Sequence, residues 1–398
     1  MSESARSAVI SGNGDPTSPV DLLPHDAADQ VPPTDGIGLG MSGGGYRAML
    51  FHLGALWRLN ELGRLPGLTR ISSVSGGSIT SGRLALAWPK LDFDPQTRVA
   101  RAFEAEVVTP IRELAGHTID LPAVVVGAVL PFISIADRIE KAYRKYVFGD
   151  ATVADLPDAA AGQPRFVINA CSVQTGALFR FERSYVADWR IGINRRAPAQ
   201  IPLARAVAAS SAFAPFLSPV VIELDPRDFE LAAGADLRRE PFTSRVVLTD
   251  GGNYDNLGLE TIYKRCRTVL VSDAVGMLPA DETPHGDWVR HGIRAVEMLL
   301  NQIVSMRKRQ LLGAMRSLTD PRPGAYWSVR SEVASYQLGD ALEFDAGFAR
   351  RLAETPTRLE ALDDDVMNGL INWGYVICDT AIRKHLDNNA PRPTRLPC

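Results

Sequence analysis

The sequence predicts an α/β fold in which a mostly parallel central sheet lies between two layers of helices, a three-layer arrangement. Short apolar segments at residues 37–42, 68–74 and 165–173 are typical of buried strands. Segments with helical periodicity follow the first two of these strands, at residues 46–63 and 76–88. Strands that alternate with helices along a chain form a parallel sheet with helices on both faces.

The remaining elements continue this alternation. Apolar strands at residues 244–250 and 267–274 each end at or next to a carboxylate. The other expected elements are a helix at residues 94–115, a helix at 137–150, a strand at 178–185, a helix that begins near 203, and long amphipathic helices at 285–316 and 366–387.

The composition is that of an ordinary globular protein. The 398 residues are 45% hydrophobic and 22% charged, and the formal net charge of −3 gives no electrostatic basis for a nucleic-acid partner. The cysteines form no CxxC pair, which argues against a zinc site and fits a reducing compartment; they are Cys171, Cys266, Cys378 and Cys398. No metal and no other cofactor is expected.

The chain is expected to have three parts. Residues 1–35 are rich in Ser, Asp, Pro and Gly and lack the basic and apolar regions of a secretory signal, so they are expected to form a disordered tail. Residues 36–275 form the α/β domain, and residues 276–398 form a mainly helical extension packed on it. No run of 18 apolar residues is present, so we expect a cytoplasmic protein, with peripheral membrane contact and oligomeric state left open.

A glycine-rich segment at residues 36–45 could in principle bind a nucleotide. Gly38, Gly40 and Gly43 match the GxGxxG pattern of dinucleotide-binding loops. The first two fall inside the expected strand, however, and the acidic Glu61 lies in a helix instead of at a strand end. We therefore do not favour nucleotide binding.

The alternative is an oxyanion-binding loop at Gly43, Gly44 and Gly45. Consecutive glycines at a strand-to-helix junction can point their N–H groups at one oxygen, and the helix N-terminus adds partial positive charge. Arg47 lies in the first helical turn, where the helix dipole disfavours a cation. It is expected to meet either a substrate anion such as a phosphate or a structural carboxylate.

Ser75 is the candidate nucleophile. It follows an apolar strand and precedes Gly76, Gly77 and a helix, which is the context of a nucleophile elbow. In the elbow pattern G-x-S-x-G, the first glycine is replaced here by Ser73. A serine-rich turn without a catalytic role is the alternative, but the glycine loop about 30 residues earlier favours catalysis.

Asp250 is the candidate general base. It ends an apolar strand, and the carboxyl ends of strands are where open α/β sheets place their active sites. Asp-Gly is also a common turn signal, but a simple hairpin does not fit the helix expected after Asn256. An ionised Asp is a weak base for a serine hydroxyl, so Asp250 would need partial desolvation to raise its pKa.

Together these segments resemble the patatin-like phospholipases. The resemblance rests on "SGGGYR" at 42–47, "SVSGG" at 73–77 and "DGG" at 250–252, in the family's order. Two further segments are similar, "AASSAFAPFLSPV" at 208–220 and "INACSVQTGALFRF" at 168–181. The resemblance covers roughly residues 36–275.

The resemblance implies a patatin-like catalytic domain at residues 36–275 and a serine lipid acyl hydrolase of the phospholipase A or lysophospholipase type. It implies a dyad of Ser75 as nucleophile and Asp250 as base, an acyl-enzyme intermediate, and a membrane lipid or lysolipid as substrate. Ala48 and Ser73 depart from the family pattern. The remaining roles expected are an oxyanion hole at Gly43, Gly44 and Gly45, substrate contact at Arg47 and Gly76, and loop support at Gly77, Gly251 and Gly252.

Two other functions remain open. In an esterase or thioesterase of the α/β-hydrolase type, His285 could complete a triad with Ser75 and Asp250. His291 and His385 lie in charged helices and are expected to be solvated, and His52 is expected to be a core histidine. The second alternative is a non-catalytic protein that binds a nucleotide or a lipid.

Two segments bear on the substrate. The uncharged residues 121–136 could form an apolar lid or cleft wall, or a buried element. The helix at 285–316 has six Arg or Lys residues against Asp287 and Glu297. It could lie on an anionic membrane or, as such helices more often do, pack its apolar face on the core.

Overall fold

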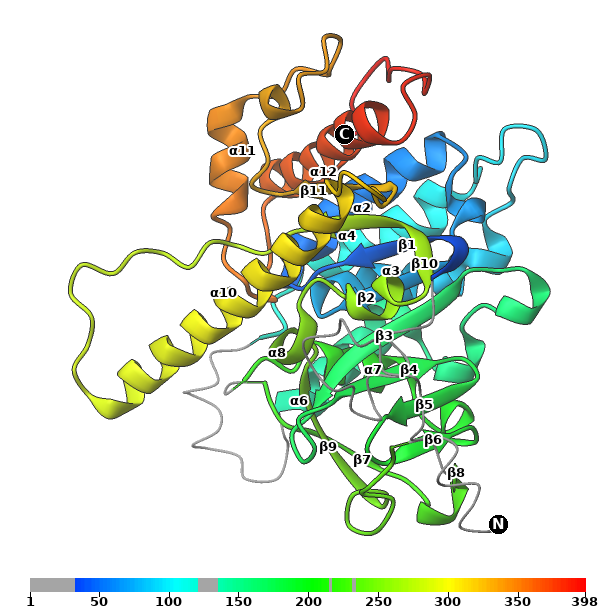
Figure 1. Cartoon of the computed structure of the whole chain (residues 1–398), viewed down its shortest axis with the longest axis vertical. Coiled ribbons are helices and arrows are strands. Elements are labelled where there is room, and N and C mark those ends of the chain that lie inside the picture. The colour runs from blue at the N-terminus through cyan, green and yellow to red at the C-terminus, as the bar shows by residue number, and fades with distance from the viewer. Residues whose placement is uncertain (1–32, 121–134, 215–216, 231–233) are drawn as a thin grey trace.

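The computed structural model describes residues 33–120, 135–214, 217–230 and 234–398 (Figure 1). Nearly all of the predicted tail therefore lies outside the described residues. So does the apolar segment expected at 121–136, except for its last two residues.

The centre of the molecule is a sheet whose middle strands run parallel, as the sequence predicts. They follow the order β11-β10-β1-β2-β3 (Figure 1). Helices cover both faces, so the predicted three-layer α/β fold is confirmed. The bounds of these strands are β1 Thr34–Met41, β2 Arg70–Val74, β3 Arg165–Ser172, β10 Cys266–Asp273 and β11 Gly324–Ser328.

Beyond β3 the sheet continues with antiparallel strands, which the sequence analysis did not predict. The connections there are short: only two residues separate β4 from β5, too few for a parallel crossover. β9 pairs with both β3 and β7. These strands are β4 Leu178–Glu182, β5 Tyr185–Asp188, β6 Gly192–Asn194, β7 Val220–Glu223, β8 Phe229–Glu230 and β9 Arg245–Asp250.

The predicted helices form, with one correction. Asp94 accepts hydrogen bonds from the backbone N–H groups of Gln96 and Thr97, and Arg98 has a positive φ, so the segment expected to begin a helix at 94 folds as a turn. The α-helices are α2 Gly45–Glu61, α3 Gly76–Ala87, α4 Thr109–Ala115, α6 Ile135–Tyr143, α7 Leu203–Ser210, α8 Gly252–Asp255, α9 Glu260–Tyr263, α10 Trp288–Met315, α11 Ala346–Ala353 and α12 Asp364–His385.

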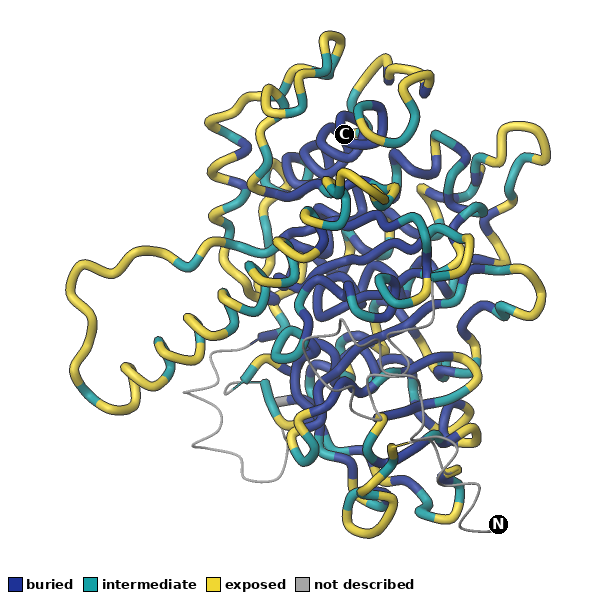
Figure 2. The backbone as a smooth tube through the Cα atoms, viewed as in Figure 1, coloured by how far each residue is buried: buried dark blue, intermediate teal, exposed yellow. Residues whose placement is uncertain are grey.

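The two faces of β1 have separate cores. Leu39 and Met41 point into the larger core, which contains α2, α3 and α12 and appears as the buried centre of Figure 2. Gly38 and Gly40 point the other way, where a Cβ atom would lie 2.7 Å from Ile262 Cβ or 2.8 Å from a backbone carbonyl. These two glycines of the GxGxxG match therefore allow close packing inside a strand, and the dinucleotide interpretation loses its structural basis.

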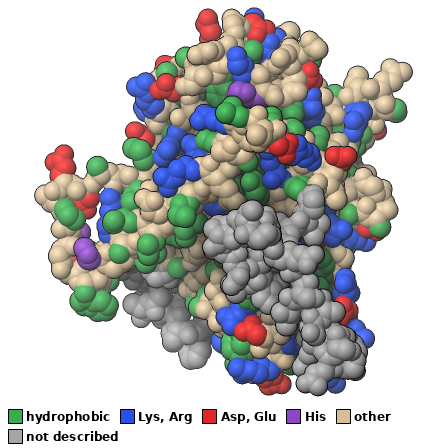
Figure 3. Space-filling model, viewed as in Figure 1, with side chains coloured by type: hydrophobic (Ala, Val, Ile, Leu, Met, Phe, Trp, Pro, Cys, Tyr) green, Lys and Arg blue, Asp and Glu red, His purple; other side chains and the backbone are tan. Residues whose placement is uncertain are grey.

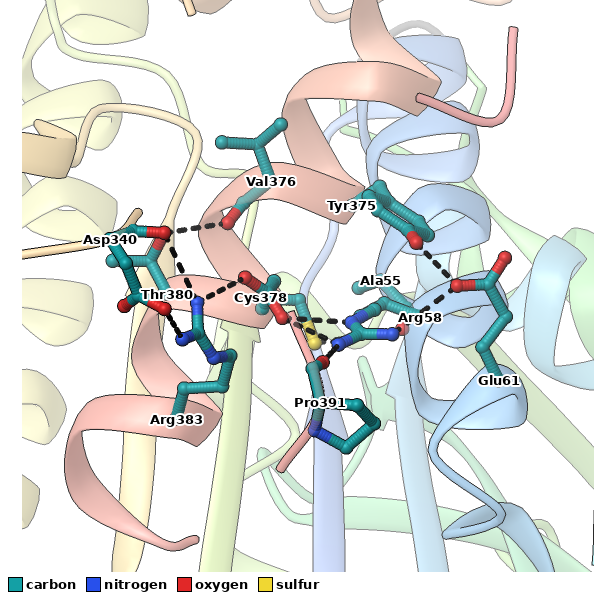
Figure 4. Close-up of polar contacts among 11 residues, drawn as sticks. Ala55, Arg58, Glu61, Asp340, Tyr375, Val376, Cys378, Thr380, Arg383 and Pro391 are labelled. Atoms are coloured by element: carbon teal, nitrogen blue, oxygen red, sulfur yellow. Dashed lines mark hydrogen bonds and ion pairs between the residues drawn. The ribbon is translucent and has the colours of Figure 1, made fainter. Parts of the chain in front are cut away.

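The C-terminal helix α12 crosses α2 at two glycines. A Cβ atom at Gly54 would lie 1.9 Å from the carbonyl oxygen of Ile371, and one at Gly374 would lie 1.9 Å from the carbonyl oxygen of Phe51. A buried ion pair lies along the same contact: the Arg58 Nε donates to Asp379 Oδ1 at 2.8 Å. Figure 4 shows the Arg58 side chain between α2 and α12. The C-terminal helix is thus held to the first helix by backbone contact and by buried charge.

Gly54→Ala should therefore destabilise the protein by about 2–3 kcal/mol or more, because the helices must separate to admit the methyl group. Gly292→Ala is the matched control. Nothing lies within 4 Å of that Cβ position on α10, so the higher helix propensity of Ala should leave stability unchanged or raise it by about 0.5–1 kcal/mol. Urea unfolding followed by circular dichroism measures both. Equal stability of the two variants would contradict the close crossing.

In the described ranges, no helix combines the length and the apolarity needed to cross a membrane.

Candidate active site

The ends of β2 and β9 meet on one edge of β3. Val74, the last residue of β2, pairs with Asn169 of β3. Asp250, the last residue of β9, pairs with Ala170, the next residue of β3. β4 pairs with the other edge of β3. β2 is parallel to β3 and β9 is antiparallel to it, so the two strands approach from opposite directions. Ser75, the residue after β2, is thereby brought to Asp250.

This arrangement corrects the reason for which Asp250 was expected at the site. We expected Asp250 there because open α/β sheets place their active sites at the carboxyl ends of strands. β9 instead runs against β3. The carboxylate reaches the serine because the carboxyl ends of two opposed strands meet.

Ser75 has the backbone conformation of a strained elbow. Its φ of 52° and ψ of −122° are rarely adopted by a residue with a side chain, and it joins β2 directly to α3. A Cβ atom at Gly76 would lie 2.1 Å from the Gly45 carbonyl oxygen, and one at Gly77 would lie 2.6 Å from that of Met41. These glycines let the elbow pack against the glycine loop. Gly77 supports the loop geometrically, while substrate contact by Gly76 stays a prediction.

A buried hydroxyl group that the sequence analysis missed holds the elbow. Ser210 Oγ accepts a hydrogen bond from the Ser75 N–H at 3.0 Å, donates to the Asn169 carbonyl at 2.6 Å and lies 2.9 Å from Ser78 Oγ. Ser73, which replaces the glycine of the elbow pattern, joins the same network because Ser78 donates to its hydroxyl at 3.1 Å. Ser210 lies in the Ala/Ser-rich segment at 208–220, but nothing in that segment's pattern identifies which serine reaches the elbow.

Asp250 is buried, with 4% of its surface exposed, and its Oδ1 accepts the Gly252 N–H at 2.7 Å. Burial raises the pKa of Asp250 to about 7, and the Gly252 N–H and the nearby Ser75 side chain oppose that rise only in part. A Cβ atom at Gly251 would lie 2.4 Å from the Asn169 carbonyl oxygen, so the turn after Asp250 has no room for a side chain at that position. The desolvation that a serine–aspartate pair requires is therefore present.

The glycine loop lies beside Ser75. A Cβ atom at Gly43 would be 3.1 Å from Ser75 Cβ. The Gly43 N–H is engaged by Asn256, whose backbone oxygen and Oδ1 lie at 3.1 and 3.2 Å. Gly44 and Gly45 have φ angles of 139° and 61°, and their N–H groups make no hydrogen bond to any part of the chain that the structure describes. The amides of Gly44 and Gly45 are thus the ones available to a ligand.

Arg47 ties three segments together. It is 3% exposed and donates to the Ala274 carbonyl at 3.0 Å, to the Thr357 hydroxyl at 2.9 Å and to the Thr355 carbonyl. Burial lowers the pKa of its guanidinium to about 10, and nearby Asp273 opposes that shift. Its described partners are neutral oxygens, so neither a substrate anion nor a paired carboxylate is needed to explain its position. It does line the cavity described next, and direct substrate contact stays a prediction.

Ser75 and Asp250 lie on the wall of a cavity of about 1840 Å³. Its other walls come from α10, from the loop before it and from residues 329–359 of the C-terminal segment. This last wall was not predicted. The apolar side chains that line the cavity include Phe213, Leu217, Leu300, Val304, Phe344 and Trp373.

No histidine of the described residues completes a triad. His285 is exposed, its Nε2 lies 3.4 Å from Arg290, and no histidine of the described ranges lines the cavity. His52 is a core residue as predicted, with its ring nitrogens 2.8 Å from Ser272 Oγ and 2.9 Å from the Ser42 carbonyl oxygen. Burial lowers the pKa of His52 to about 4, so it is neutral at physiological pH.

The chain was compared with known proteins. Three solved structures resemble it at low identity. Human GIVD cytosolic phospholipase A2 has 13% identity and a TM-score of 0.48, with 89% of this chain and 60% of that chain covered. VipD from Legionella pneumophila has 14% identity and a TM-score of 0.31, with 85% and 67% covered. The complex of SpcU with ExoU from the type III secretion system of Pseudomonas aeruginosa has 15% identity and a TM-score of 0.25, with 90% and 72% covered.

No curated protein matches the chain. The chain spans about 60% of the length of the human enzyme. The model of the patatin-like phospholipase family matches residues 39–263, more than half of the chain, and this range contains the glycine loop, the serine elbow and Asp250. The chain therefore belongs to the patatin-like phospholipase family.

Proposed function

We propose that the protein is a serine lipid acyl hydrolase of the phospholipase A or lysophospholipase type. The observation that carries this proposal is that Ser75 and the buried Asp250 lie together on the wall of a large cavity, beside a glycine loop. Family membership supports a lipid ester as the substrate. A metal ion has no role in the proposed reaction.

In the proposed first step, Ser75 Oγ attacks the ester carbonyl carbon while Asp250 accepts the hydroxyl proton. The N–H groups of Gly44 and Gly45 stabilise the oxyanion that forms. Asp250 then gives the proton to the leaving alkoxide, which departs as an alcohol or lysolipid and leaves an acyl group on Ser75. Water, deprotonated by Asp250, attacks the acyl carbonyl carbon; the bond to Ser75 Oγ then breaks, Asp250 returns the proton to that oxygen, and the fatty acid is released.

The cavity fits the acyl chain of such a substrate. Its volume of about 1840 Å³ exceeds the roughly 300–1,000 Å³ that is usual for pockets that bind small ligands. Phe213 and Leu217 line it from the catalytic domain, and Phe344 and Trp373 line it from the C-terminal segment. An extended hydrocarbon chain could therefore lie between the two parts.

The pH dependence should report the ionisation of Asp250. Asp250 can accept the serine proton only in its ionised form, and its pKa is raised to about 7. We expect kcat/KM for a soluble ester to fall about tenfold for each pH unit below that pKa and to level off above it. Steady-state rates from pH 5 to 9 measure this. A flat profile between pH 5 and 7 would contradict a raised pKa at the catalytic base.

The same shift affects stability. A carboxyl whose folded pKa lies above its ordinary value stabilises the fold below that ordinary value, and the contribution is lost as pH rises through about 7. Asp250→Asn removes the charge, so its stability relative to the wild type should increase between pH 5 and 8. Thermal unfolding of both proteins across this range tests the expectation.

The class of substrate can be tested with a panel of a diacyl phospholipid, a lysophospholipid, a neutral glyceride and an acyl thioester. We expect release of fatty acid from the phospholipid or the lysophospholipid at a higher kcat/KM than from the others. Preference for the thioester would favour the thioesterase alternative. No turnover of any ester would favour a non-catalytic lipid-binding protein.

A further inference from the structure

Helix α10 projects from the body of the protein with a large apolar face turned to solvent. Trp288, Leu299 and Met306 are 86%, 64% and 63% exposed. With Gly292, Ala295 and Ile303 they recur at steps of three and four residues, so they form one stripe, here called the outer face of α10. This stripe contains no charged residue. In Figure 3 hydrophobic side chains gather on the projecting part of the molecule.

The opposite side of α10 is the one that packs on the protein. Leu311 is fully buried, and Val304 and Met315 pack with it on the small core that contains Val269 and Val271. The helix therefore packs one apolar face on the core, which is the more common of the two arrangements expected from the sequence. Core packing does not explain its second apolar face, which is exposed.

The cavity with Ser75 reaches the same helix. Leu300, Asn301 and Val304 of α10 line it, and so does Met277 in the loop before the helix. Met277 is also 70% exposed, so it belongs both to the cavity wall and to the surface. The cavity wall therefore lies on the packed side of α10, across the helix from the outer face.

The charges on α10 favour one kind of partner. The segment at 285–316 has six basic residues against two acidic ones, although the whole chain has a net charge of −3. Arg309 and Arg316 are exposed, and neither forms an ion pair with any residue that the structure describes. An exposed tryptophan and aliphatic stripe with cationic residues beside it is typical of helices that lie in the interface of an anionic bilayer.

We propose that the outer face of α10 docks on the surface of an anionic phospholipid bilayer and so places the cavity at the source of its lipid. This inference rests on the proposed function for its biological purpose. Its physical basis is separate: an apolar stripe, a local excess of positive charge, and a cavity on the other side of the same helix. A helix is about 10–12 Å in diameter, so the bilayer would lie within about that distance of the cavity wall.

Binding can be measured without turnover by using full-length protein with Ser75→Ala. We expect it to cosediment with vesicles of phosphatidylcholine and phosphatidylglycerol. Adding Trp288→Ala, Leu299→Gln and Met306→Gln should lower the partition coefficient between water and vesicles at least tenfold, because three exposed apolar side chains no longer enter the interface. The matched control is Val173→Gln, a 56% exposed apolar residue in another part of the fold, which should bind like its parent.

Three further readouts decide the proposal. Adding Arg309→Glu and Arg316→Glu should weaken binding to the anionic vesicles and leave binding to pure phosphatidylcholine unchanged. Vesicles with brominated acyl chains should quench the fluorescence of the Ser75→Ala protein more than that of its Trp288→Ala derivative. Equal vesicle binding of the triple variant and its parent would overturn the proposal. So would a dimer in sedimentation velocity that the triple variant abolishes, because the face would then bind a second copy.

Activity separates this proposal from the proposed function. With Ser75 intact, the triple variant should hydrolyse a monomeric soluble ester at the wild-type rate, since none of the three changed residues lines the cavity. It should lose activity on vesicles in proportion to its lost binding. Loss of soluble-ester hydrolysis would contradict the proposed role of α10. A wild type that binds vesicles and hydrolyses no ester would instead contradict the proposed function alone.

Discussion

Ser75→Ala is expected to lower the kcat for ester hydrolysis by about 10⁴-fold or more, because it removes the attacking hydroxyl of the proposed reaction. Asp250→Asn should have a comparable effect. The amide has nearly the same shape and can keep the hydrogen bond from the Gly252 N–H, but it cannot accept the serine proton. Rates on a soluble ester and on vesicles measure both losses.

The losses of activity caused by Ser75→Ala and by Asp250→Asn should not be additive in the double variant. If Ser75 and Asp250 act as one unit, the double variant should be no slower than Ser75→Ala alone. His285→Ala is the control, because His285 is exposed and does not line the cavity, and it should keep wild-type activity. A fall of 100-fold or more in His285→Ala would restore the triad alternative. Wild-type rates in Ser75→Ala would refute the proposed mechanism.

Asp379→Asn is expected to lower the free energy of unfolding by about 3–5 kcal/mol. Asp379 is fully buried and faces two buried cations, with Arg58 Nε at 2.8 Å and an Arg383 nitrogen at 3.5 Å. Burial raises the pKa of Asp379 and the arginines oppose that shift, so the variant loses the ion pair but also the cost of burying that charge. The arginines remain charged, and each keeps only a more exposed carboxylate, Glu61 for Arg58 and Asp340 for Arg383.

Urea unfolding measures this loss. Asp225→Asn is the matched control, since Asp225 pairs with Arg227 on the surface and its removal should leave stability almost unchanged. The double variant Asp379→Leu with Arg58→Met should recover part of the loss, because it removes opposite charges together. Wild-type stability in Asp379→Asn would show that the ion pair does not hold α12 to α2.

The sequence predicted the local parts of the site well because each depends on a few adjacent residues. The "SGGGYR" loop, the "SVSGG" elbow and the "DGG" turn lie where strand and helix patterns placed them. Positive φ angles at Gly44 and Gly45, and close contacts at Gly76, Gly77 and Gly251, explain why glycine stands at those positions. Such requirements are visible in the chain itself.

Long-range pairing could not be predicted in the same way. The antiparallel direction of β9 depends on its partners β3 and β7 and leaves no local signal. The contribution of Ser210 depends on α7 reaching the elbow from a distant part of the chain. β11 and α11 have five and eight residues, which is short for recognition by periodicity. Asp345 caps α11 by accepting the Phe348 N–H at 2.9 Å.

The central claim is that Ser75 is a nucleophile activated by Asp250. Its most direct test is the reaction of the full-length protein with a long-chain alkyl fluorophosphonate, followed by peptide mass spectrometry. The account predicts a single phosphonyl adduct on Ser75 in the wild type and at least a hundredfold slower labelling of Asp250→Asn. An adduct on another residue, or equal labelling rates in the two proteins, would contradict it.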